Sequence, residues 1–389
     1  MIQKIKTEVV ADQVADGANN SSCSPANEQQ TTSPTKKMWD WLWSRSADAT
    51  PLGNDACLEI YNRGFADGGL IRLVSRRRQG EHPVAGIALQ PTRRWKLFRE
   101  FRVPNNPWFQ GGSLLTNKHK VTTKSFKDLA TQIKALPCSF VTIDWAYDTI
   151  ELQRLIDGLN LVGCHSIREQ HFEIGLVNIT NDWEAYFAER SKSFRKKIRR
   201  SLKKLQRQGD VKLERHRDLK DVGQLNELLE DAFRIEHLSW KGQSQTSVNS
   251  YGKERELYIE AMHQLASDGL LELQFLTVNG QRIAFEIGML ARNESNKKTW
   301  YSHKIGYDPQ FAQFSPGQLL MYFQLREWFE TREVSVVDTV GDLSEASARW
   351  CNEITTQYRY IIATRFTAWQ LLKSYQWLKP MAKRLLGRS

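Results

Sequence analysis

The sequence of 389 residues lacks the features that stabilise secreted or membrane-spanning proteins. Its five cysteines are odd in number, scattered, and never spaced as Cys-x-x-Cys, which gives neither a disulfide framework nor a structural zinc site. It has no apolar run of the ~18 residues that a transmembrane helix needs, and its first residues lack the apolar run of a signal peptide. We therefore expect no bound metal and a cytoplasmic protein.

Acidic residues are absent from two segments that hold much of the basic charge. Residues 190–208 contain ten Lys and Arg, and residues 365–389 contain six. These 16 charges exceed the net charge of +11, so the rest of the chain carries a charge of −5. Because the basicity is local, the composition does not indicate a general nucleic-acid-binding surface.

Composition and periodicity divide the chain into four parts. Residues 1–38 are rich in Asn, Ser, Thr, Gln and Ala and have no aromatic residue, so we expect a disordered tail. Residues 55–178 mix short strands and helices without a Gly-rich phosphate-binding fingerprint. Residues 182–365 form a second domain, and residues 366–389 a basic amphipathic segment.

The second domain is expected to contain an antiparallel meander. Strands are predicted at 271–278, 282–291 and 299–305, joined by Asn279-Gly280, a pair preferred in type I′ turns, and by Asn293-Glu-Ser-Asn296. Residues 183–208 have the period of one basic helix with an apolar stripe. Helices at 222–238 and 317–330 and a strand at 334–338 complete an α+β pattern.

Five motifs in this order resemble those of a known family. They are Ser191-Lys-Ser-Phe-Arg195 before the basic helix, Ser239-Trp-Lys-Gly242, Asn279-Gly-Gln-Arg-Ile-Ala-Phe-Glu286, the stretch from Tyr307 to Leu320, and Val337-Asp338 with Gly341-Asp342 and Trp350 downstream. The sequence resembles the acetyltransferases named CelD or BcsL, which are associated with cellulose biosynthesis and are tandem relatives of the Fem-type aminoacyl transferases. The resemblance covers most of residues 55–365. It implies tandem acyl-CoA N-acyltransferase (GNAT-like) domains with mixed, mostly antiparallel sheets flanked by helices, the first domain being degenerate.

The resemblance implies a transferase that moves an acetyl or other acyl group from acyl-CoA to an amine or a sugar hydroxyl, in exopolysaccharide or cell-envelope biosynthesis. One rival is a Fem-type enzyme that uses aminoacyl-tRNA. The other is a binding protein that keeps the fold without turnover, since the family's Tyr-Lys pair between Gly341-Asp342 and Trp350 is missing here.

The donor's phosphates are expected at the start of the helix near residue 317. A helix N-terminus presents unpaired N–H groups and partial positive charge, Ser is a good N-cap, Pro suits the first turn, and Gly allows close approach of a ligand. An ordinary capped helix is the alternative. The expected donor-binding residues are Phe314, Ser315, Pro316, Gly317 and Gln318, joined through the resemblance by Arg195 of the basic helix.

Acyl transfer needs a base for the acceptor and an acid or relay for the leaving thiolate. Glu286, a carboxylate among small and apolar strand neighbours, is a candidate base, or else a solvated strand residue. Tyr301 and His303 share a strand face and are candidate acids or relays, while a structural role for the histidine stays open. Asp338 ends a strand and either orients the acceptor or caps a turn.

Acceptor binding is assigned to Trp240, Lys241, Asp342 and Arg349. The first two either border the cleft or belong to a surface loop. Asp342 shapes the loop after the strand, and Arg349 either replaces the missing lysine or marks a different substrate.

The two basic segments each leave alternatives. For the basic helix at 190–208 there are three alternatives. Its charged face is solvated, or its Lys and Arg side chains bind the donor's phosphates, as the resemblance implies, or the helix binds RNA. Residues 366–389 either dock on the protein's own core or lie on the anionic inner face of the membrane.

Overall fold

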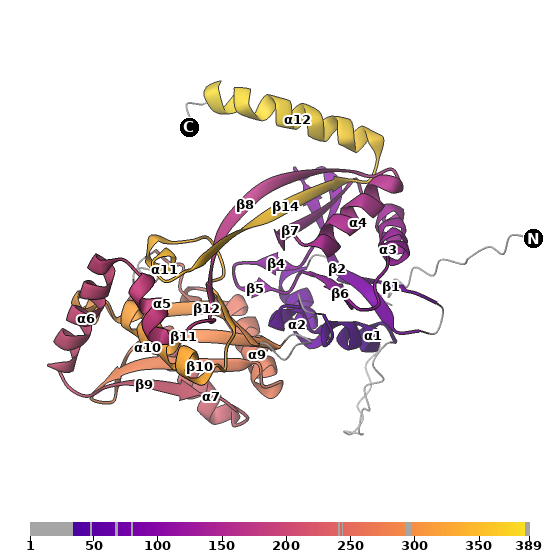
Figure 1. Cartoon of the computed structure of the whole chain (residues 1–389). Coiled ribbons are helices and arrows are strands. Elements are labelled where there is room, and N and C mark those ends of the chain that lie inside the picture. Colours follow the sequence, from indigo (N-terminus) through magenta and orange to yellow (C-terminus); the bar gives the residue numbers. More distant parts are fainter. Residues whose placement is uncertain are drawn as a thin grey trace, which may run out of the picture.

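The computed structural model describes residues 34–46, 49–66, 69–78, 81–239, 242, 244–292 and 298–385. In this part of the chain a 12-stranded sheet passes through both halves of the molecule in the order β1-β2-β3-β7-β14-β8-β13-β12-β11-β10-β9, with β6 paired to β2 (Figure 1). The expected α+β class is confirmed, with helices on both sides of one large mixed sheet.

The first half contains the elements up to residue 178. They are α1 (Pro34–Trp43), η1 (Pro51–Gly53), α2 (Asp55–Phe65), β1 (Ile71–Arg76), β2 (Pro83–Arg94), β3 (Phe98–Arg102), β4 (Asn105–Asn106), β5 (Phe109–Gln110), β6 (Leu114–Thr116), α3 (Thr123–Ala135), β7 (Phe140–Tyr147), α4 (Ile150–Leu161) and β8 (His165–Asn178). Helix α1 begins inside the expected tail, and residues 1–33 lie outside the described residues.

The second half contains the predicted meander. Its elements are α5 (Trp183–Glu189), α6 (Lys192–Gln206), β9 (Val211–His216), α7 (Val222–Leu238), η2 (Val248–Ser250), α9 (Gly252–Ser267), β10 (Leu271–Val278), β11 (Gln281–Arg292), β12 (Lys298–Tyr307), η3 (Pro309–Phe314), α10 (Pro316–Thr331), β13 (Val336–Asp338) and α11 (Glu345–Ala348), followed by β14 (Glu353–Ala363) and α12 (Phe366–Leu385). The turn predicted at 293–296 lies outside the described residues.

The prediction of a single helix at 183–208 is wrong, because the helical conformation is interrupted between α5 and α6. Arg190 is extended, with φ −68° and ψ 151°, and it ends α5. The side chain of Ser191 then accepts a hydrogen bond from the N–H of Phe194 at 3.3 Å, which begins α6. The predicted apolar stripe is real: Phe194, Ile198 and Leu205 are buried and belong to the core beneath α10.

Strands β8 and β14 join the two halves of the sheet. Strand β14 returns from the end of the second half and pairs antiparallel with both β7 and β8. Strand β13 pairs antiparallel with β8 and parallel with β12. In Figure 1 the long ribbons of β8 and β14 cross from one half to the other, so that residues from β7, β8 and β13 meet at the junction.

The second half buries a separate core on each side of its sheet. One core contains α5, α6 and α10 side chains with Trp300 and Val337 of the strands, and the other contains α7 and α9 side chains with Phe285 and Ile287. Alternate residues of a strand point to opposite faces, so neighbours along β11 and β12 serve different cores. This alternation decides which predicted site residues can meet.

Candidate active site

A cavity of about 310 Å³ lies at the junction of the two halves. It is lined on one side by Asn105, Gln110, Trp145 and Tyr147 of the first half and on the other by Tyr301, Asp338 and Val340 of the second half. Its volume is at the lower end of the range for small-molecule sites. Polar and aromatic side chains from different elements converge in it, as in a binding site for a small polar acceptor.

A partly buried hydrogen bond joins the two sides of this cavity wall. The hydroxyl of Tyr147, at the end of β7, donates to Oδ2 of Asp338 at 2.5 Å. The other carboxylate oxygen, Oδ1, accepts from the N–H of Val340 at 2.9 Å, so Asp338 caps its own turn and also contacts the first half. Burial raises the pKa of Asp338, and the hydrogen bond from Tyr147 opposes that rise. The pKa of Tyr147 is raised well above its usual value by burial and by this carboxylate.

Two residues of the cavity wall have left-handed backbone conformations. Val340 has φ +45° and Trp145 has φ +57°. A positive φ is unfavourable for a β-branched or bulky residue, and such strain clusters at functional sites, held by the surrounding structure. Here the turn at Val340 directs its N–H toward Asp338 and thereby orients the carboxylate.

Strands β12 and β13 separate beside the cavity. Their parallel pairing covers three residue pairs and ends at Tyr301 and Asp338, whereas β12 continues to Tyr307. A β-bulge interrupts the pairing of β11 and β12 between Ile287 and Gly288, opposite residues 302–304. Bulges re-aim side chains and are common next to active sites. Strand β12 thus continues past the end of β13 toward η3 and α10.

The bulge lies next to a second group of polar and aromatic side chains. The ring of His303 stacks on that of Tyr258 with centroids 5.6 Å apart. The ammonium of Lys304 lies 3.3 Å from a carboxylate oxygen of the fully buried Glu236 and 4.6 Å from the ring centroid of Trp108. His303 is therefore on the side of the sheet that also holds Tyr301, but it is not part of the cavity wall.

The N-terminus of α10 has a different geometry from the one expected. Ser315 occupies the N-cap position as predicted, but its backbone is left-handed, with φ 55° and ψ 55°, and its side chain makes no cap hydrogen bond. Pro316 occupies the first turn as predicted. A Cβ at Gly317 would meet only Tyr307 Cδ1, at 3.8 Å, which leaves the helix start open to a ligand.

The remaining donor-binding candidates lie close to this helix start. Phe314 is buried and packs in the core beneath α10. The amide of Gln318 donates to the carbonyl of Ala346 at 3.3 Å and accepts from Nε1 of Trp350 at 3.0 Å. Gln318 thus ties the start of α10 to the segment after β13.

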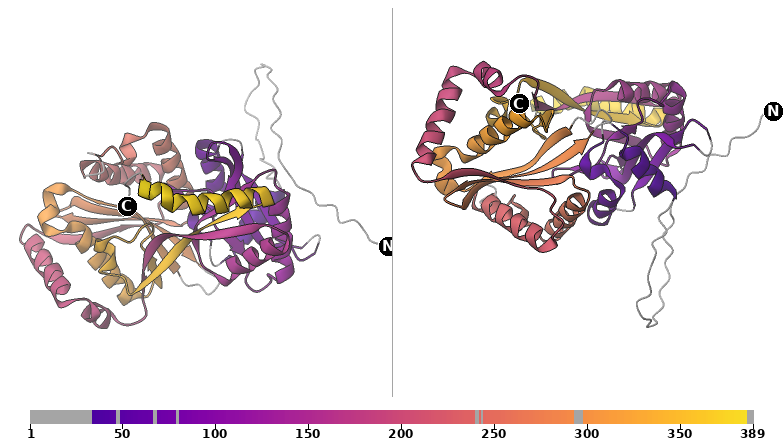
Figure 2. Two further views of the ribbon diagram at one scale, coloured as in Figure 1. Left: turned by 90° about the horizontal axis from the view of Figure 1, so that it is seen from above. Right: turned by 60° about the horizontal axis from the view of Figure 1, so that its bottom comes forward.

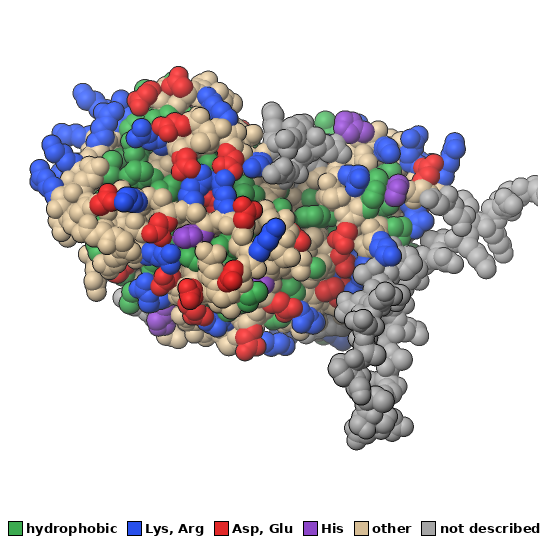
Figure 3. Space-filling model, turned by 90° about the horizontal axis from the view of Figure 1, so that it is seen from below, with side chains coloured by type: hydrophobic (Ala, Val, Ile, Leu, Met, Phe, Trp, Pro, Cys, Tyr) green, Lys and Arg blue, Asp and Glu red, His purple; other side chains and the backbone are tan. Residues whose placement is uncertain are grey.

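Helix α6 presents a basic concave surface near η3 and α10. A hollow of about 690 Å³ is lined by Lys192, Arg195, Lys196, Arg199, Arg200, Lys203, Lys204 and Arg207. Helix α6 contacts both η3 and α10. Figure 3 shows Lys and Arg side chains gathered at the edge of the molecule where α6 lies. Arg195, the predicted phosphate ligand, donates from Nε to the carbonyl of Arg190 at 3.0 Å and borders this hollow.

Glu286 lies on the opposite side of the sheet from the cavity, beneath α10. It is fully buried and accepts a hydrogen bond from Trp300 Nε1 at 2.8 Å. The ring of Trp300 occupies the position that a side chain at Gly288 would need, since a Cβ there would lie 1.8 Å from it. Burial raises the pKa of Glu286, but the carboxylate is not part of the cavity wall.

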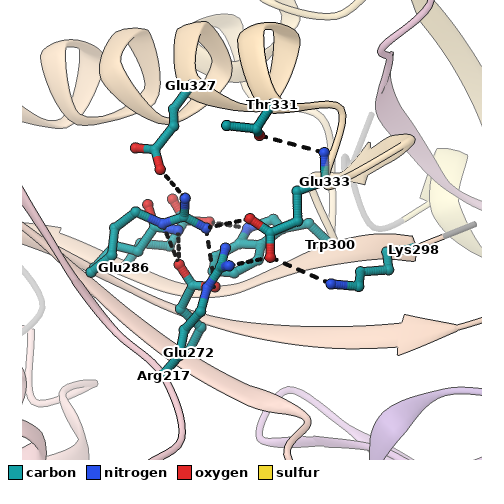
Figure 4. Close-up of polar contacts among 10 residues, drawn as sticks. Arg217, Glu272, Glu286, Lys298, Trp300, Glu327, Thr331 and Glu333 are labelled. Atoms are coloured by element: carbon teal, nitrogen blue, oxygen red, sulfur yellow. Dashed lines mark hydrogen bonds and ion pairs between the residues drawn. The ribbon is translucent and has the colours of Figure 1, made fainter.

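A partly buried ionic network, centred on the fully buried Glu272, lies beside that carboxylate. Arg215 lies 2.7 Å from Glu272 and also contacts Glu327, and Arg217 contacts Glu272 and Glu333. Figure 4 shows Arg217, Glu272, Glu327 and Glu333 meeting in the space between α10 and the strands. Burial raises the pKa of Glu272 to about 7, against the effect of Arg215. The network joins α10 to the sheet and has a structural role that sequence analysis did not identify.

The two predicted acceptor residues that the structure describes, Asp342 and Arg349, do not line the cavity. Asp342 is exposed on the loop after β13, and Arg349 is exposed and pairs with Glu345 at 3.5 Å. Trp240 and Lys241 lie outside the described residues. Of the predicted catalytic residues, the structure brings together Tyr301 and Asp338.

Sequence analysis missed the contribution of the first half. Trp145 and Tyr147 lie in the last part of β7. Asn105 belongs to the short β4–β5 hairpin, and its side-chain amide donates to the carbonyls of Gly112 and Asp144 at 3.2 and 3.1 Å. The polar and aromatic run after residue 143 was the available signal. It indicated no chemistry until the fold placed it beside Asp338.

Comparison with known proteins agrees with this architecture. Residues 192–348 match the family described as "Acetyltransferase (GNAT) domain", and this match supports an acyltransferase activity. The fold is similar to that of the C-terminal domain (DUF2156) of a putative lysylphosphatidylglycerol synthetase from Agrobacterium fabrum, with 13% identity, a TM-score of 0.52, and coverage of 88% of this chain and 96% of that chain. It is also similar to FemX, with 12% identity, a TM-score of 0.55, and coverage of 84% and 96%. No match to a curated protein sequence was found.

Proposed function

We propose that the acetyltransferase (GNAT) domain at residues 192–348 transfers an acyl group from acyl-CoA, with acetyl-CoA as the first candidate, to an amine or sugar hydroxyl held in the junction cavity. The observation that carries the proposal is the separation of β12 from β13 at Tyr301 and Asp338, directly at the cavity wall. This opening gives an extended donor a route from the start of α10 to the acceptor.

The donor's pyrophosphate would lie at the N-terminus of α10. Helix N-termini bind phosphate through their N–H groups and dipole, and the open Gly317 lets the ligand approach. From Tyr307 back to Tyr301 the seven residues of β12, separated by six steps, span roughly 20 Å at a strand's rise per residue. An extended pantetheine arm along this part of β12 would bring its thioester to the cavity.

Within the cavity Asp338 would accept the acceptor's proton. The acceptor nitrogen or oxygen attacks the thioester carbonyl, a bond to the acyl carbon forms, the carbon–sulfur bond breaks, and the thiolate leaves with a proton. Tyr147 and the Val340 N–H hold the carboxylate in place. Burial raises the pKa of Asp338 toward that of a useful base. Tyr301, on the same wall, is placed to donate a proton to the thiolate.

The resemblance of the sequence to the CelD and BcsL acetyltransferases suggests a biological setting for this proposal. We assign the acceptor to exopolysaccharide or cell-envelope biosynthesis, and the protein to the cytoplasm or the inner face of the membrane. The absence of the family's Tyr-Lys pair from residues 343–349 bears on the identity of the acceptor more than on that of the donor.

Helix α6 favours a second candidate, transfer of an aminoacyl group from tRNA. Its eight Lys and Arg form a surface that suits a polyphosphate backbone. Under the first function the same surface would contribute only a few side chains, such as Arg195, to the phosphates of CoA.

Thermal unfolding of the whole protein with acetyl-CoA, free CoA or charged tRNA separates these functions, because a ligand that binds the folded state raises the unfolding temperature. We expect stabilisation by acetyl-CoA and CoA. Stabilisation by charged tRNA alone, with a steep loss at higher salt, would establish the second candidate instead. No stabilisation by any CoA species would refute the first.

A further inference from the structure

An exposed aromatic and basic surface lies far from the cavity, on α12 and the turn between β2 and β3. Helix α12 lies over β8 and β14 along one side of the molecule (Figures 1 and 2). Ala368 and Leu372 are buried against the sheet, which attaches the helix. Its exposed apolar side chains are Phe366, Leu371, Tyr375, Trp377 and Leu378, of which Trp377 is 70% exposed.

The β2–β3 turn extends this surface. The ring of Trp95 lies 4.9 Å from that of Tyr375, so the turn and the helix form one patch. Leu97 follows and is 75% exposed. Leu371, Tyr375 and Leu378 are spaced i, i+4 and i+7, which places them along one stripe of the helix. Contiguous apolar patches of this kind mark interaction sites on soluble proteins.

The turn has an unfavourable backbone that presents these side chains. Trp95 and Lys96 have φ +51° and φ +61°, and the N–H of Leu97 donates to the carbonyl of Arg94 at 3.1 Å. Consecutive left-handed residues are the pattern of a type I′ turn, for which Asn-Gly is preferred. A tryptophan and a lysine are disfavoured there, and strain of this kind is retained where a surface is functional.

The charge of the surface selects its partner. Among the residues of this surface whose exposure the structure describes, the exposed cations are Arg93, Lys96, Arg99, Arg365 and Lys373. The sequence has no acidic residue at 91–99 or 365–385. A second copy of the chain would bring these like charges together across a symmetric interface, which disfavours self-association. Aromatic side chains interspersed with Lys and Arg instead match an anionic membrane interface.

We propose that α12 and the β2–β3 turn together bind the surface of an anionic phospholipid bilayer. Helix α12 lies in the plane of the interface, with Trp95, Leu97, Trp377 and the Leu371 stripe inserted among the headgroups and the cations facing the lipid phosphates. Among the described helices none is long and apolar enough to cross a membrane. The inference concerns a surface separate from the junction cavity and holds whether or not acyl-CoA is the donor.

Co-sedimentation of the full chain with vesicles tests this, using phosphatidylcholine containing phosphatidylglycerol and phosphatidylcholine alone. We expect binding to the anionic vesicles that weakens with salt. Trp377→Ser should abolish it, and Lys373→Glu should weaken it by at least about fivefold, the factor expected for one basic charge at such a surface. Leu161→Ser, a substitution of an exposed leucine at the end of α4, is the matched control and should bind normally.

Lys96→Gly separates membrane binding from stability. Glycine adopts positive φ without steric penalty, so the unfolding temperature should stay the same or rise, whereas binding to anionic vesicles should fall. Equal binding by wild type and Trp377→Ser would overturn the proposal. So would a wild-type dimer that Trp377→Ser converts to a monomer, with no vesicle binding by either protein.

Discussion

The hydroxyl of Tyr147 donates to the carboxylate of Asp338 at 2.5 Å, although 191 positions separate them in the chain. One residue ends β7 in the first half and the other ends β13 in the second. Strands β14 and β8, which lie between β7 and β13 in the sheet, bring these ends to one cavity. The junction of the halves is therefore the place where a carboxylate, a phenol and an opening between strands coincide.

Asp338→Asn is expected to lower kcat/KM for acyl transfer by about 10²- to 10⁴-fold, the usual contribution of a general base. The amide keeps the shape of the side chain but accepts no proton. Asp342→Asn, on the exposed loop four residues later, should change kcat/KM little. Steady-state kinetics of both variants with the same acceptor checks this, and the opposite order would move the base to Asp342.

Tyr147→Phe should move the acid limb of the pH–rate profile to higher pH. The hydrogen bond from Tyr147 lowers the pKa of Asp338, so its loss raises that pKa further. Because the deprotonated carboxylate is the active form, activity is then lost at a higher pH as the solution is acidified. An unchanged pH profile with normal folding would show that Asp338 does not titrate in the reaction.

Gly317→Glu should prevent stabilisation by acetyl-CoA while the protein still folds. The space around Gly317 admits a side chain, since a Cβ added there would have only Tyr307 Cδ1 within 4 Å, at 3.8 Å. The added carboxylate would repel the donor's phosphates and oppose the helix dipole's preference for them. Gly317→Ala is the steric control and should retain most of the stabilisation. Normal CoA binding by Gly317→Glu would place the donor elsewhere.

Glu286→Gln should keep acyl transfer and change the pH dependence of stability. Burial raises the pKa of Glu286 in the folded protein, so the protonated form is favoured there. The protonated Glu286 therefore costs the folded protein no stability below the ordinary pKa of ~4.3. As the pH rises through the pKa that Glu286 has in the folded protein, its ionisation lowers the free energy of unfolding. Glutamine does not ionise, so the variant does not lose stability in this way. The unfolding temperature of the variant relative to that of the wild type should therefore rise from pH 5 to pH 8. A large fall in kcat would restore Glu286 as a catalytic candidate.

Local pattern was sufficient for most elements of the second half. Strand β10 and helix α7 have the predicted bounds, because alternation and the Asn279-Gly280 turn leave few alternatives. The break between α5 and α6 was missed because the period of the apolar stripe continues across Arg190 and Ser191. The ionic network under α10 was also missed, since Arg215, Glu272 and Glu333 come from separate elements.

The sequence by itself determined the meander, the open helix start at Gly317 and the two basic segments, since each depends on residues close together in the chain. Tertiary structure alone decided which of the candidate catalytic residues meet. Glu286 and Tyr301 lie on adjacent strands, yet the alternation of side chains and the bulge in β11 place one beneath α10 and the other in the cavity. Tyr147 became part of the site only because β14 and β8 join two sheets into one, a long-range pairing that no local pattern specifies.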